Sequence, residues 1–423
     1  MEKKDTPLTS LREPLALSDR AARLSRRLRE LAAISSQAGG ITRLFLTPEH
    51  IAANTLVASW MEEAGLTVQI DAVGNIIGRY EGETPDAPAL MIGSHLDTVQ
   101  DAGRFDGPLG VMIGIEAVDN LRRAGLRLPF SLEVVGFWDE EGVRFGGSYL
   151  GSRALSGQVL AEHLDIKDSE GITIARALEA IGLPPDRIGT ASRRGAPPLA
   201  YIEVHIEQGP VLEREGLALG CVTAISGSIR AQFDVEGIAG HAGTLPMQGR
   251  RDAMAAAAEC ILAVEQIATD AGIVGTVGLV QSRTNAGNVV PGKVRFSIDV
   301  RDQDNDALAA AFEQLLARFT AIAARRGVMI SEVVRRCSDA KACAQGIVNQ
   351  ISAALEANGH PPRLLQSGAG HDGIAMSELA PFGMVFVRCR QGISHNPAEH
   401  ASDEDIAEAI DVLDHVIANF RSE

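Results

Sequence analysis

Hydrophobic positions along the chain form short continuous runs separated by longer stretches with a helical period. Residues 89–93 and 131–137 are almost wholly apolar, as expected for strands buried on both faces. Between them, residues 109–124 have a helical pattern that ends at Gly125. This strand–helix–strand order predicts a parallel α/β layer.

Further segments extend this first layer. Helices are expected near residues 19–35, 47–64, 345–358 and 403–420, short strands at 68–70 and 75–79, and a buried strand at 384–387. Residues 200–206 alternate, with Val204 and its apolar neighbours on one face and Glu203 and His205 on the other. The alternation predicts a half-buried strand with a functional polar face.

The order of the predicted helices and strands changes after residue 220. Strands are expected at 229–236, 273–282, 293–301 and 328–335, and helices at 250–268 and 305–326. This βαββαβ order is that of a ferredoxin-like fold. We therefore expect two domains, a catalytic α/β domain of residues 1–220 and 337–423 and an inserted α+β domain of residues 221–336.

Composition excludes several classes of protein. The chain has 423 residues and a net charge of −16, with no run of Lys or Arg, which argues against nucleic-acid binding. No segment approaches the ~20 apolar residues that a membrane helix needs, and the first 20 residues contain no signal-like apolar core. The five cysteines are scattered without a CxxC pair. We expect a cytoplasmic protein without disulfides or a zinc knuckle.

Acidic residues and histidines follow the predicted strands of the α/β layer, where ligands bind in open sheets of this kind. They are His95 and Asp97 after the first strand, Asp106 in the next loop, Glu140 and Glu141 after the second, His205 at the end of the third and His395 after the last. A lone histidine at a strand end is usually structural, and paired acids are usually a solvated loop. Their joint occurrence favours a site for two divalent metal ions.

The residue types suggest distinct roles at such a site. Asp97, two residues beyond His95 on an extended segment, suits a carboxylate that orients a ligating imidazole. Glu140 points differently from Glu141 and is free to act as general base towards the attacking water.

Six motifs resemble a known family. The chain is similar, from about Gly40 to its C-terminus, to the hydantoinase/carbamoylase branch of the M20 metallopeptidase-like amidohydrolases. The motifs are GSHLDTV at 93–99, FDGPLGV at 105–111, DEEGVRF at 139–145, HIEQG at 205–209, GHAGT at 240–244 and GISHNP at 392–397. The resemblance implies an M20-type catalytic domain with a mixed sheet and flanking helices, and an inserted ferredoxin-like lid and dimerisation domain.

The resemblance also implies the metal ligands. One ion would be held by His95, Asp106 and His205, and the second by Asp106, Glu141 and His395, with Asp106 bridging. Glu140 takes the position of the general base. The two ions would be zinc or manganese, with cobalt or nickel as alternatives.

Four further residues match substrate contacts of the family. Gln208 matches a substrate-contacting residue, His241 a catalytic histidine that polarises the scissile carbonyl, and Asn288 and Arg301 residues that hold the substrate carboxylate. On sequence alone, Arg301 equally suits a solvated strand face and His241 a local turn. The family forms homodimers through the inserted domain, with the equivalents of His241 and Asn288 reaching the partner's active site.

The resemblance implies hydrolysis of a ureido (carbamoyl) C–N bond in a small carboxylate substrate. Segments 100–103, 138–145 and 367–372 look most like allantoate amidohydrolases, which convert allantoate to ureidoglycine, ammonia and CO2 in purine catabolism. An N-carbamoyl-L-amino acid or N-carbamoyl-β-alanine is the alternative substrate. An M20 dipeptidase is less favoured, because His205 replaces a carboxylate ligand common in those peptidases. His371, in a segment that departs from the usual pattern, has no assigned role.

Overall fold

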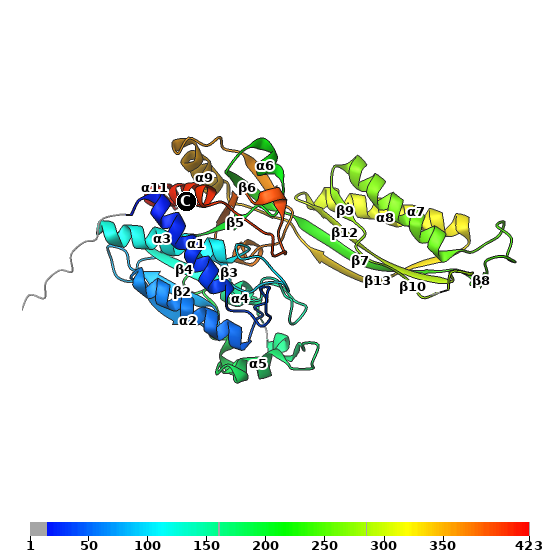
Figure 1. Ribbon diagram of the computed structural model, residues 1–423, viewed down its shortest axis with the longest axis horizontal. Helices are drawn as coiled ribbons and strands as arrows, with labels where there is room; N and C mark the ends of the chain where they lie inside the picture. The colour runs from blue at the N-terminus through cyan, green and yellow to red at the C-terminus, as the bar shows by residue number, and fades with distance from the viewer. Residues whose placement is uncertain (1–14, 160, 285, 423) are drawn as a thin grey trace, which may run out of the picture. The chain divides into compact units, whose positions relative to one another are not determined.

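The protein is described by a computed structural model that covers residues 15–159, 161–284 and 286–422. The chain divides into two compact units (Figure 1). Unit 1 consists of Met1–Thr223, Cys343–Leu365 and His371–Glu423, and unit 2 of Ala224–Ala342 and Gln366–Gly370. Unit 2 is thus formed almost entirely by one continuous segment within the sequence of unit 1.

Unit 1 is an α/β layer. Its strands are β1 Thr67–Ile70, β2 Ile76–Tyr80, β3 Ala89–His95, β4 Ser131–Phe137, β5 Ala200–Ile206, β6 Leu219–Ile225, β15 Leu364–Ser367 and β16 Phe382–Val387. Its helices are α1 Leu17–Ala32, α2 Pro48–Glu63, α3 Pro108–Ala124, α4 Leu150–Leu155, α5 Ile174–Ala180, α6 Val211–Glu215, α9 Gln345–Ala357, α10 Gly373–Met376 and α11 Asp403–Asn419. Short 3-10 helices span Ala161–Asp165, Pro185–Ala191 and Arg390–Gly392.

The sheet of unit 1 is mixed. Its strand order is β1-β2-β4-β3-β5-β16-β6, with β15 also paired to β6 and the short strand β14 (Lys341–Ala342) next to β6 at the end of the order. The neighbours β4, β3, β5 and β16 run parallel to one another. β2 and β6 flank this parallel centre in the antiparallel sense. Because parallel strands share one carboxyl edge, everything that follows these four strands starts from the same side of the sheet.

Strand β5 corrects one expectation from the sequence. All seven of its residues are buried, including Glu203 and His205, so it is not a half-buried strand. The reason is its central place between β3 and β16, where both faces of the sheet are covered. The alternation of polar and apolar residues therefore indicated buried polar groups and not a solvated face.

Unit 2 is an antiparallel sheet with two helices. Its strands are β7 Gly227–Glu236, β8 Gly240–His241, β9 Val274–Thr276, β10 Val280–Ser282, β11 Val289–Val290, β12 Lys293–Asp302, β13 Met329–Ser338 and β14 Lys341–Ala342, and its helices are α7 Ala253–Ala271 and α8 Asn305–Arg326. The main sheet has the order β10-β12-β7-β13, with β9 also paired to β12. The long elements follow the βαββαβ order expected from the sequence.

The predicted strand at 273–282 is wrong in one respect, because it is two short strands. β9 and β10 both pair with β12 but are interrupted between Thr276 and Val280. Glycine weakens a strand interior, and Gly278 lies in the interruption.

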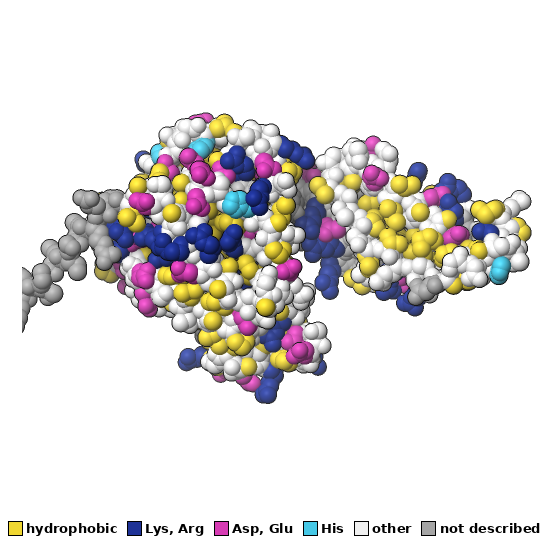
Figure 2. Space-filling model, viewed as in Figure 1, with side chains coloured by type: hydrophobic (Ala, Val, Ile, Leu, Met, Phe, Trp, Pro, Cys, Tyr) yellow, Lys and Arg dark blue, Asp and Glu magenta, His cyan; other side chains and the backbone are white. Residues whose placement is uncertain are grey.

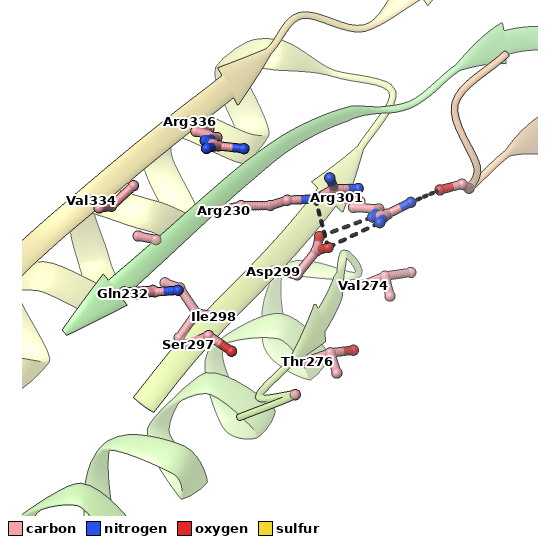
Figure 3. A pocket seen from close by; sticks show the side chains of 13 residues that line it. Arg230, Gln232, Val274, Thr276, Ser297, Ile298, Asp299, Arg301, Val334 and Arg336 are labelled. Carbon is pink, nitrogen blue, oxygen red and sulfur yellow. Dashed lines mark hydrogen bonds and ion pairs between the residues drawn. The ribbon is translucent and has the colours of Figure 1, made fainter. Parts of the chain in front are cut away.

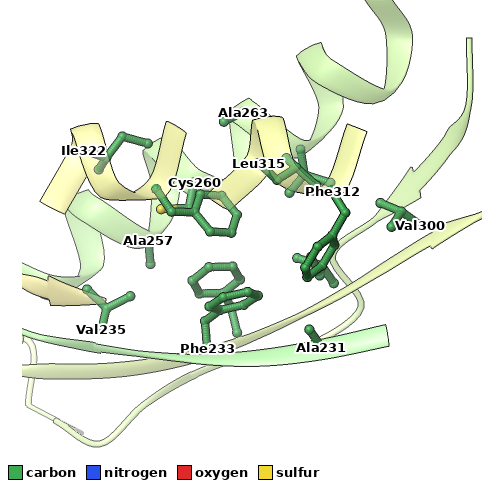
Figure 4. Close-up of a cluster of buried hydrophobic side chains, with 14 of the residues drawn as sticks. Ala231, Phe233, Val235, Ala257, Cys260, Ala263, Val300, Phe312, Leu315 and Ile322 are labelled. Atoms are coloured by element: carbon green, nitrogen blue, oxygen red, sulfur yellow. The ribbon is translucent and has the colours of Figure 1, made fainter. Parts of the chain in front are cut away.

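Aromatic side chains form the centre of the unit 2 core (Figure 4). Phe233 of β7, Phe296 of β12 and Phe319 of α8 meet with ring centroids 5.1 to 5.6 Å apart. α7 and α8 supply the other apolar residues that cover this face of the sheet. The two long helices are therefore fixed to the sheet by one continuous hydrophobic cluster.

Helix α8 is the one helix, among the described residues, long and apolar enough to cross a membrane by length and composition. Its apolar side chains include Leu308, Phe312, Leu315 and Phe319, all of which are buried in the unit 2 core. Packing on the sheet therefore accounts for these large apolar residues of the helix.

Replacing Phe296 with alanine should destabilise the protein by about 3–5 kcal/mol, because it removes a fully buried ring from the aromatic cluster. Denaturant unfolding of the full chain measures this loss. Leu126→Ala, which truncates a side chain of unit 1 that is 53% exposed, is the control and should change stability by about 0.5 kcal/mol or less. Equal effects of the two substitutions would contradict the assigned core.

Candidate active site

The candidate metal ligands predicted from the sequence converge at the carboxyl edge of the parallel strands of unit 1. His95 ends β3 and His205 lies one residue before the end of β5. Glu140 and Glu141 follow β4, and His395 follows β16. Since β4, β3, β5 and β16 are consecutive neighbours in the sheet, segments far apart in the sequence meet at one place.

Asp106 lies at the centre of this group. Its Oδ1 is 3.4 Å from Nε2 of His95 and 3.2 Å from Nε2 of His205. Its Oδ2 is 3.4 Å from Nε2 of His395, which in turn is 3.3 Å from Oε1 of Glu141. The two oxygens of one carboxylate thus face two separate sets of potential ligands, and each set is close enough to hold a metal ion.

The buried histidines are oriented as metal ligands are. Nδ1 of His95 lies 3.0 Å from the carbonyl oxygen of Asp97, and Nδ1 of His205 lies 2.9 Å from that of Ile206. In the neutral ring each Nδ1–H then donates to a carbonyl, which leaves the Nε2 lone pair directed at Asp106. A lone pair facing a carboxylate oxygen is repulsive unless a cation or a proton lies between them. The donor set therefore fits divalent metal ions.

The buried acidic side chains also favour a metal site. The acids buried at and around this edge of the sheet include Asp97, Asp106, Asp139, Glu140, Glu203, Glu207, Asp372 and Glu399. Burial raises the pKa of Asp97 to about 6, and burial together with the charge of Asp97 raises the pKa of Asp139 well above its usual value. Metal cations would stabilise such a concentration of carboxylates in their charged form.

Glu140 is placed for proton transfer. Its side chain is buried, and its Oε2 lies 3.9 Å from Nε2 of His95. Burial raises its pKa well above the usual value; the charge of His95 lowers it, and the charge of Glu141 raises it. A carboxylate with a raised pKa at this point can accept a proton and hold it, as a general base must.

Asp97 lies beside His95 as expected, and its carboxylate makes further contacts. Its carboxylate is 3.8 Å from Nδ1 of His95, and the main-chain carbonyl of Asp97 is the atom that contacts this ring. The Asp97 carboxylate accepts hydrogen bonds from the main-chain N–H groups of Glu140 and Glu141, both at 3.2 Å. Asp97 thus fixes the loop that carries the two glutamates.

Other residues that hold the site were missed in the sequence. Glu399 accepts hydrogen bonds from the N–H groups of Phe105 and Asp106, at 2.7 and 3.0 Å, and so fixes the backbone of the central aspartate. Ser394 donates to Oδ2 of Asp106 at 2.5 Å. Ser394 lies within the GISHNP motif and Glu399 two residues after it, but neither has a spacing that would have marked its role. His371 packs its ring edge-on against His205, with centroids 4.5 Å apart, and therefore supports that ligand.

Three of the eight described residues other than glycine that have a positive φ lie at this site. Asp139, Gln208 and His395 have φ angles of 66°, 55° and 55°, in the left-handed region that residues with a side chain rarely occupy. Such strain is typical of sites where geometry is imposed by function. Gln208 uses its conformation to donate from Nε2 to Oδ2 of Asp106 at 2.8 Å.

The remaining predicted residues belong to unit 2. His241 and Asn288 lie in adjacent strand ends, since β8 pairs with β11 and the N–H of Ala242 donates to the carbonyl of Asn288. Nδ1 of His241 accepts from the N–H of Gly243 at 3.1 Å, so the neutral ring carries its proton on Nε2. Arg301 lies on β12 and forms a bidentate ion pair with Asp299.

The chain matches the profile of peptidase family M20/M25/M40 over residues 91–419. It is 43% identical over 397 residues to an N-carbamoyl-L-amino acid amidohydrolase from Geobacillus stearothermophilus, covering 93% of this chain and 97% of that protein. It is 38% identical over 418 residues to an allantoate deiminase from Arabidopsis thaliana, covering 90% and 79%. The crystal structure of a hydantoinase/carbamoylase family amidase from Burkholderia multivorans superposes with a TM-score of 0.88 at 36% identity, covering 94% and 97%.

Gly107 provides a test of the site geometry. Its φ is +84°, and a Cβ at this position would lie 2.5 Å from the ring of His95. Gly107→Ala should therefore displace this ring and weaken binding of a divalent metal at least about tenfold, as loss of ligand orientation typically does. Metal titration followed by calorimetry measures the affinity.

Gly146→Ala is the matched control. Gly146 has a similar φ of +70°, but a Cβ there would meet nothing within 4 Å. The control carries the same backbone strain without the contact to the ring, and should bind metal as the unsubstituted protein does. Equal metal affinity in both variants would contradict the role assigned to His95.

Proposed function

The chain belongs to peptidase family M20/M25/M40, and we propose that it is a two-metal amidohydrolase. It would cleave the ureido C–N bond of a small carboxylate substrate, and allantoate is the first candidate for that substrate. The relatives named above are amidohydrolases and deiminases of non-peptide C–N bonds, and this chain is a metal-dependent hydrolase of the same kind. The observation that carries the proposal is the position of Asp106 between two sets of imidazole and carboxylate ligands.

The proposed ligands are those that Asp106 brings together. His95 and His205 would hold one ion with Oδ1 of Asp106, and His395 and Glu141 the other with Oδ2. When bound, the two cations would polarise the ureido carbonyl and lower the pKa of water at the site. Zinc and manganese suit this mixed imidazole and carboxylate set, and cobalt and nickel are alternatives.

Residues of the chain supply the proton transfers and the orientation. Glu140 accepts the proton of the attacking water and returns it to the leaving nitrogen, and the carbamate that is released decomposes to CO2 and ammonia. Gln208 donates from Nε2 to Asp106 and Ser394, and its Oε1 is buried without a hydrogen-bond partner among the described residues. This oxygen is an acceptor suited to the N–H of a ureido group.

Residues of unit 2 complete the proposed site. Nε2–H of His241 would donate to the developing oxyanion of the scissile carbonyl. Asn288 and Arg301 would hold the substrate carboxylate, for which a guanidinium is the preferred partner. Unit 2 would then act as a lid that excludes water when substrate binds.

Two substrate classes remain in competition. Segments such as WDEEGVRF at 138–145 and SGAGHD at 367–372 support allantoate. The 43% identity to an N-carbamoyl-L-amino acid amidohydrolase supports an N-carbamoyl-L-amino acid as the second candidate. A dipeptide is disfavoured, because His205 occupies a ligand position at which a carboxylate is common in peptidases of this fold.

Ammonia release by the manganese-loaded protein tests the proposal. Allantoate, N-carbamoyl-L-amino acids, N-carbamoyl-β-alanine and dipeptides are compared at equal concentrations, with free amino groups measured for the dipeptides. We expect allantoate to give the highest kcat/KM. Preference for an N-carbamoyl-L-amino acid would replace the first candidate by the second, and hydrolysis of dipeptides alone would contradict the proposed reaction.

Glu140→Gln should keep metal binding and lower kcat by about 10²–10⁴-fold, because a general base contributes about that much. Metal content by elemental analysis and turnover under saturating substrate measure the two effects. Glu83→Gln, at an exposed position, should leave both unchanged. Near-normal kcat in Glu140→Gln would remove this residue from the mechanism.

We further propose that the protein is a homodimer formed through unit 2, with His241 and Asn288 completing the active site of the partner subunit. Unit 2 exposes several large apolar side chains, and Figure 2 shows hydrophobic side chains gathered on the face of it that is in view. Large exposed apolar side chains of unit 2 include Ile238, Met247, Leu262, Val280, Met329 and Val333. Exposed apolar surface of this kind is typical of protein interfaces.

Mixed dimers test the shared site. Glu140→Gln and His241→Ala chains should each be inactive as pure dimers. Co-expressed, they should recover about a quarter of the wild-type activity, because half of the dimers are mixed and each mixed dimer has one complete site. No recovery, with mixed dimers shown to be present, would mean that His241 acts within its own chain.

A further inference from the structure

A cavity of about 740 Å³ lies on the open face of the unit 2 sheet (Figure 3). Side chains alternate between the two faces of a strand. On β7, the side chains of Arg230 and Gln232 therefore point away from the core and line the cavity, whereas Phe233 and Ala231, which also borders the cavity, are buried against the helices. The cavity is thus built by the polar face of the sheet that carries Arg301.

Arginines dominate this face. Arg336 of β13, Arg230 of β7 and Asp299 of β12 are opposite one another in register on three neighbouring strands. Arg301 lies two residues beyond Asp299 and so points to the same side. Three guanidinium groups thus share the cavity with a single carboxylate among its lining residues.

Asp299 binds two of the three arginines together. Its carboxylate accepts from Nε and Nη2 of Arg301, both at 2.9 Å, and from Nε of Arg230 at 3.0 Å. The Arg230 and Arg301 guanidinium groups are therefore neighbours on one carboxylate. Burial acts to raise the pKa of Asp299, but the two arginines more than compensate, and the net shift is downward.

Arg230 is only partly used by this pairing. Only its Nε is hydrogen-bonded, and its two Nη groups contact no acceptor among the residues that the structure describes. Its side chain is 59% exposed. An arginine that is fixed in position through Nε, and whose Nη groups have no acceptor, is oriented to donate to a ligand oxygen.

We propose that Arg230 is a specificity-determining residue, whose guanidinium binds an oxygen acceptor on the α-carbon substituent of the substrate. The inference rests on the proposed function, in which Arg301 binds the substrate carboxylate. A carboxylate is bonded directly to the α-carbon, so the α-substituent lies within reach of the arginine next to Arg301. Substrates with an oxygen acceptor there satisfy Arg230, whereas an aliphatic side chain leaves its donors without a partner.

Two substituents carry this chemistry. One is the second ureido group of allantoate, which presents a neutral carbonyl oxygen. The other is the side-chain carboxylate of an acidic N-carbamoyl amino acid such as N-carbamoyl-L-aspartate. N-carbamoyl-L-leucine has the same reacting group and α-carboxylate but no acceptor in its side chain, and so serves as the reference substrate.

Arg230→Gln tests the proposal through kcat/KM on these three substrates. For the substrate whose oxygen Arg230 binds, the substitution should lower kcat/KM by about 10- to 100-fold, as expected for a hydrogen bond to a charged group. Hydrolysis of N-carbamoyl-L-leucine should change less than about threefold. A selective loss with allantoate identifies the ureido group as the ligand, and a selective loss with N-carbamoyl-L-aspartate identifies the carboxylate.

Arg336→Gln is the matched control. It removes the same charge from the same row of the sheet, but Arg336 is one strand further from Asp299 and Arg301 than Arg230 is. It should leave the ratio of kcat/KM between the substrates unchanged. Equal losses on all three substrates in Arg230→Gln, or the same change of ratio in Arg336→Gln, would overturn the inference in favour of general attraction of anions.

Binding provides a second readout that does not require turnover. In the Glu140→Gln background, calorimetry should show weaker binding of the selected substrate when Arg230→Gln is added, by the same factor as kcat/KM. If the unsubstituted protein hydrolyses no ureido compound, the proposed function itself is wrong. If it does hydrolyse them and Arg230→Gln leaves the substrate ratio unchanged, only the inference about Arg230 is wrong.

Discussion

Concentration of negative charge at the carboxyl edge of a parallel sheet is the constraint on which the rest of unit 1 depends. Carboxylates buried side by side, with imidazole lone pairs directed at one of them, are unstable without a compensating cation. Asp106 offers one oxygen to His95 and His205 and the other to His395. The fold therefore assembles a site that needs positive charge, and the chemistry that we propose follows from that need.

The surrounding structure fixes this arrangement mainly through the backbone. Carbonyl groups set the tautomers of the two buried histidines, Asp97 holds the N–H groups of the loop with Glu140 and Glu141, and Glu399 holds the N–H of Asp106. Unit 2 contributes a different kind of surface, in which Asp299 groups arginines on an open sheet face. Charge is thus organised by carboxylates in both units, as ligands in one and as supports for arginines in the other.

Much of this could be predicted from the sequence, and the limits have physical reasons. Apolar runs ending in His95 or followed by Glu140 were sufficient to locate the parallel strands. They also located the residues that meet at the strand ends, because the carboxyl ends of parallel strands lie at the same edge of the sheet. Side-chain orientation was not accessible: the hydrogen bonds of the Asp97 carboxylate go to the backbone of the loop with Glu140 and Glu141, and β5 is buried on both faces. The role of Glu399 could not be predicted, since it depends on a contact across 293 positions of the chain.

The central claim is that Asp106 lies between two metal ions. The most direct measurement is anomalous X-ray diffraction from crystals of the zinc- or manganese-loaded protein, recorded on both sides of the absorption edge of the metal. The account predicts two anomalous peaks in each subunit, one beside Oδ1 of Asp106 with His95 and His205, and one beside Oδ2 with Glu141 and His395. A single peak, or peaks away from Asp106 at full metal loading, would contradict it.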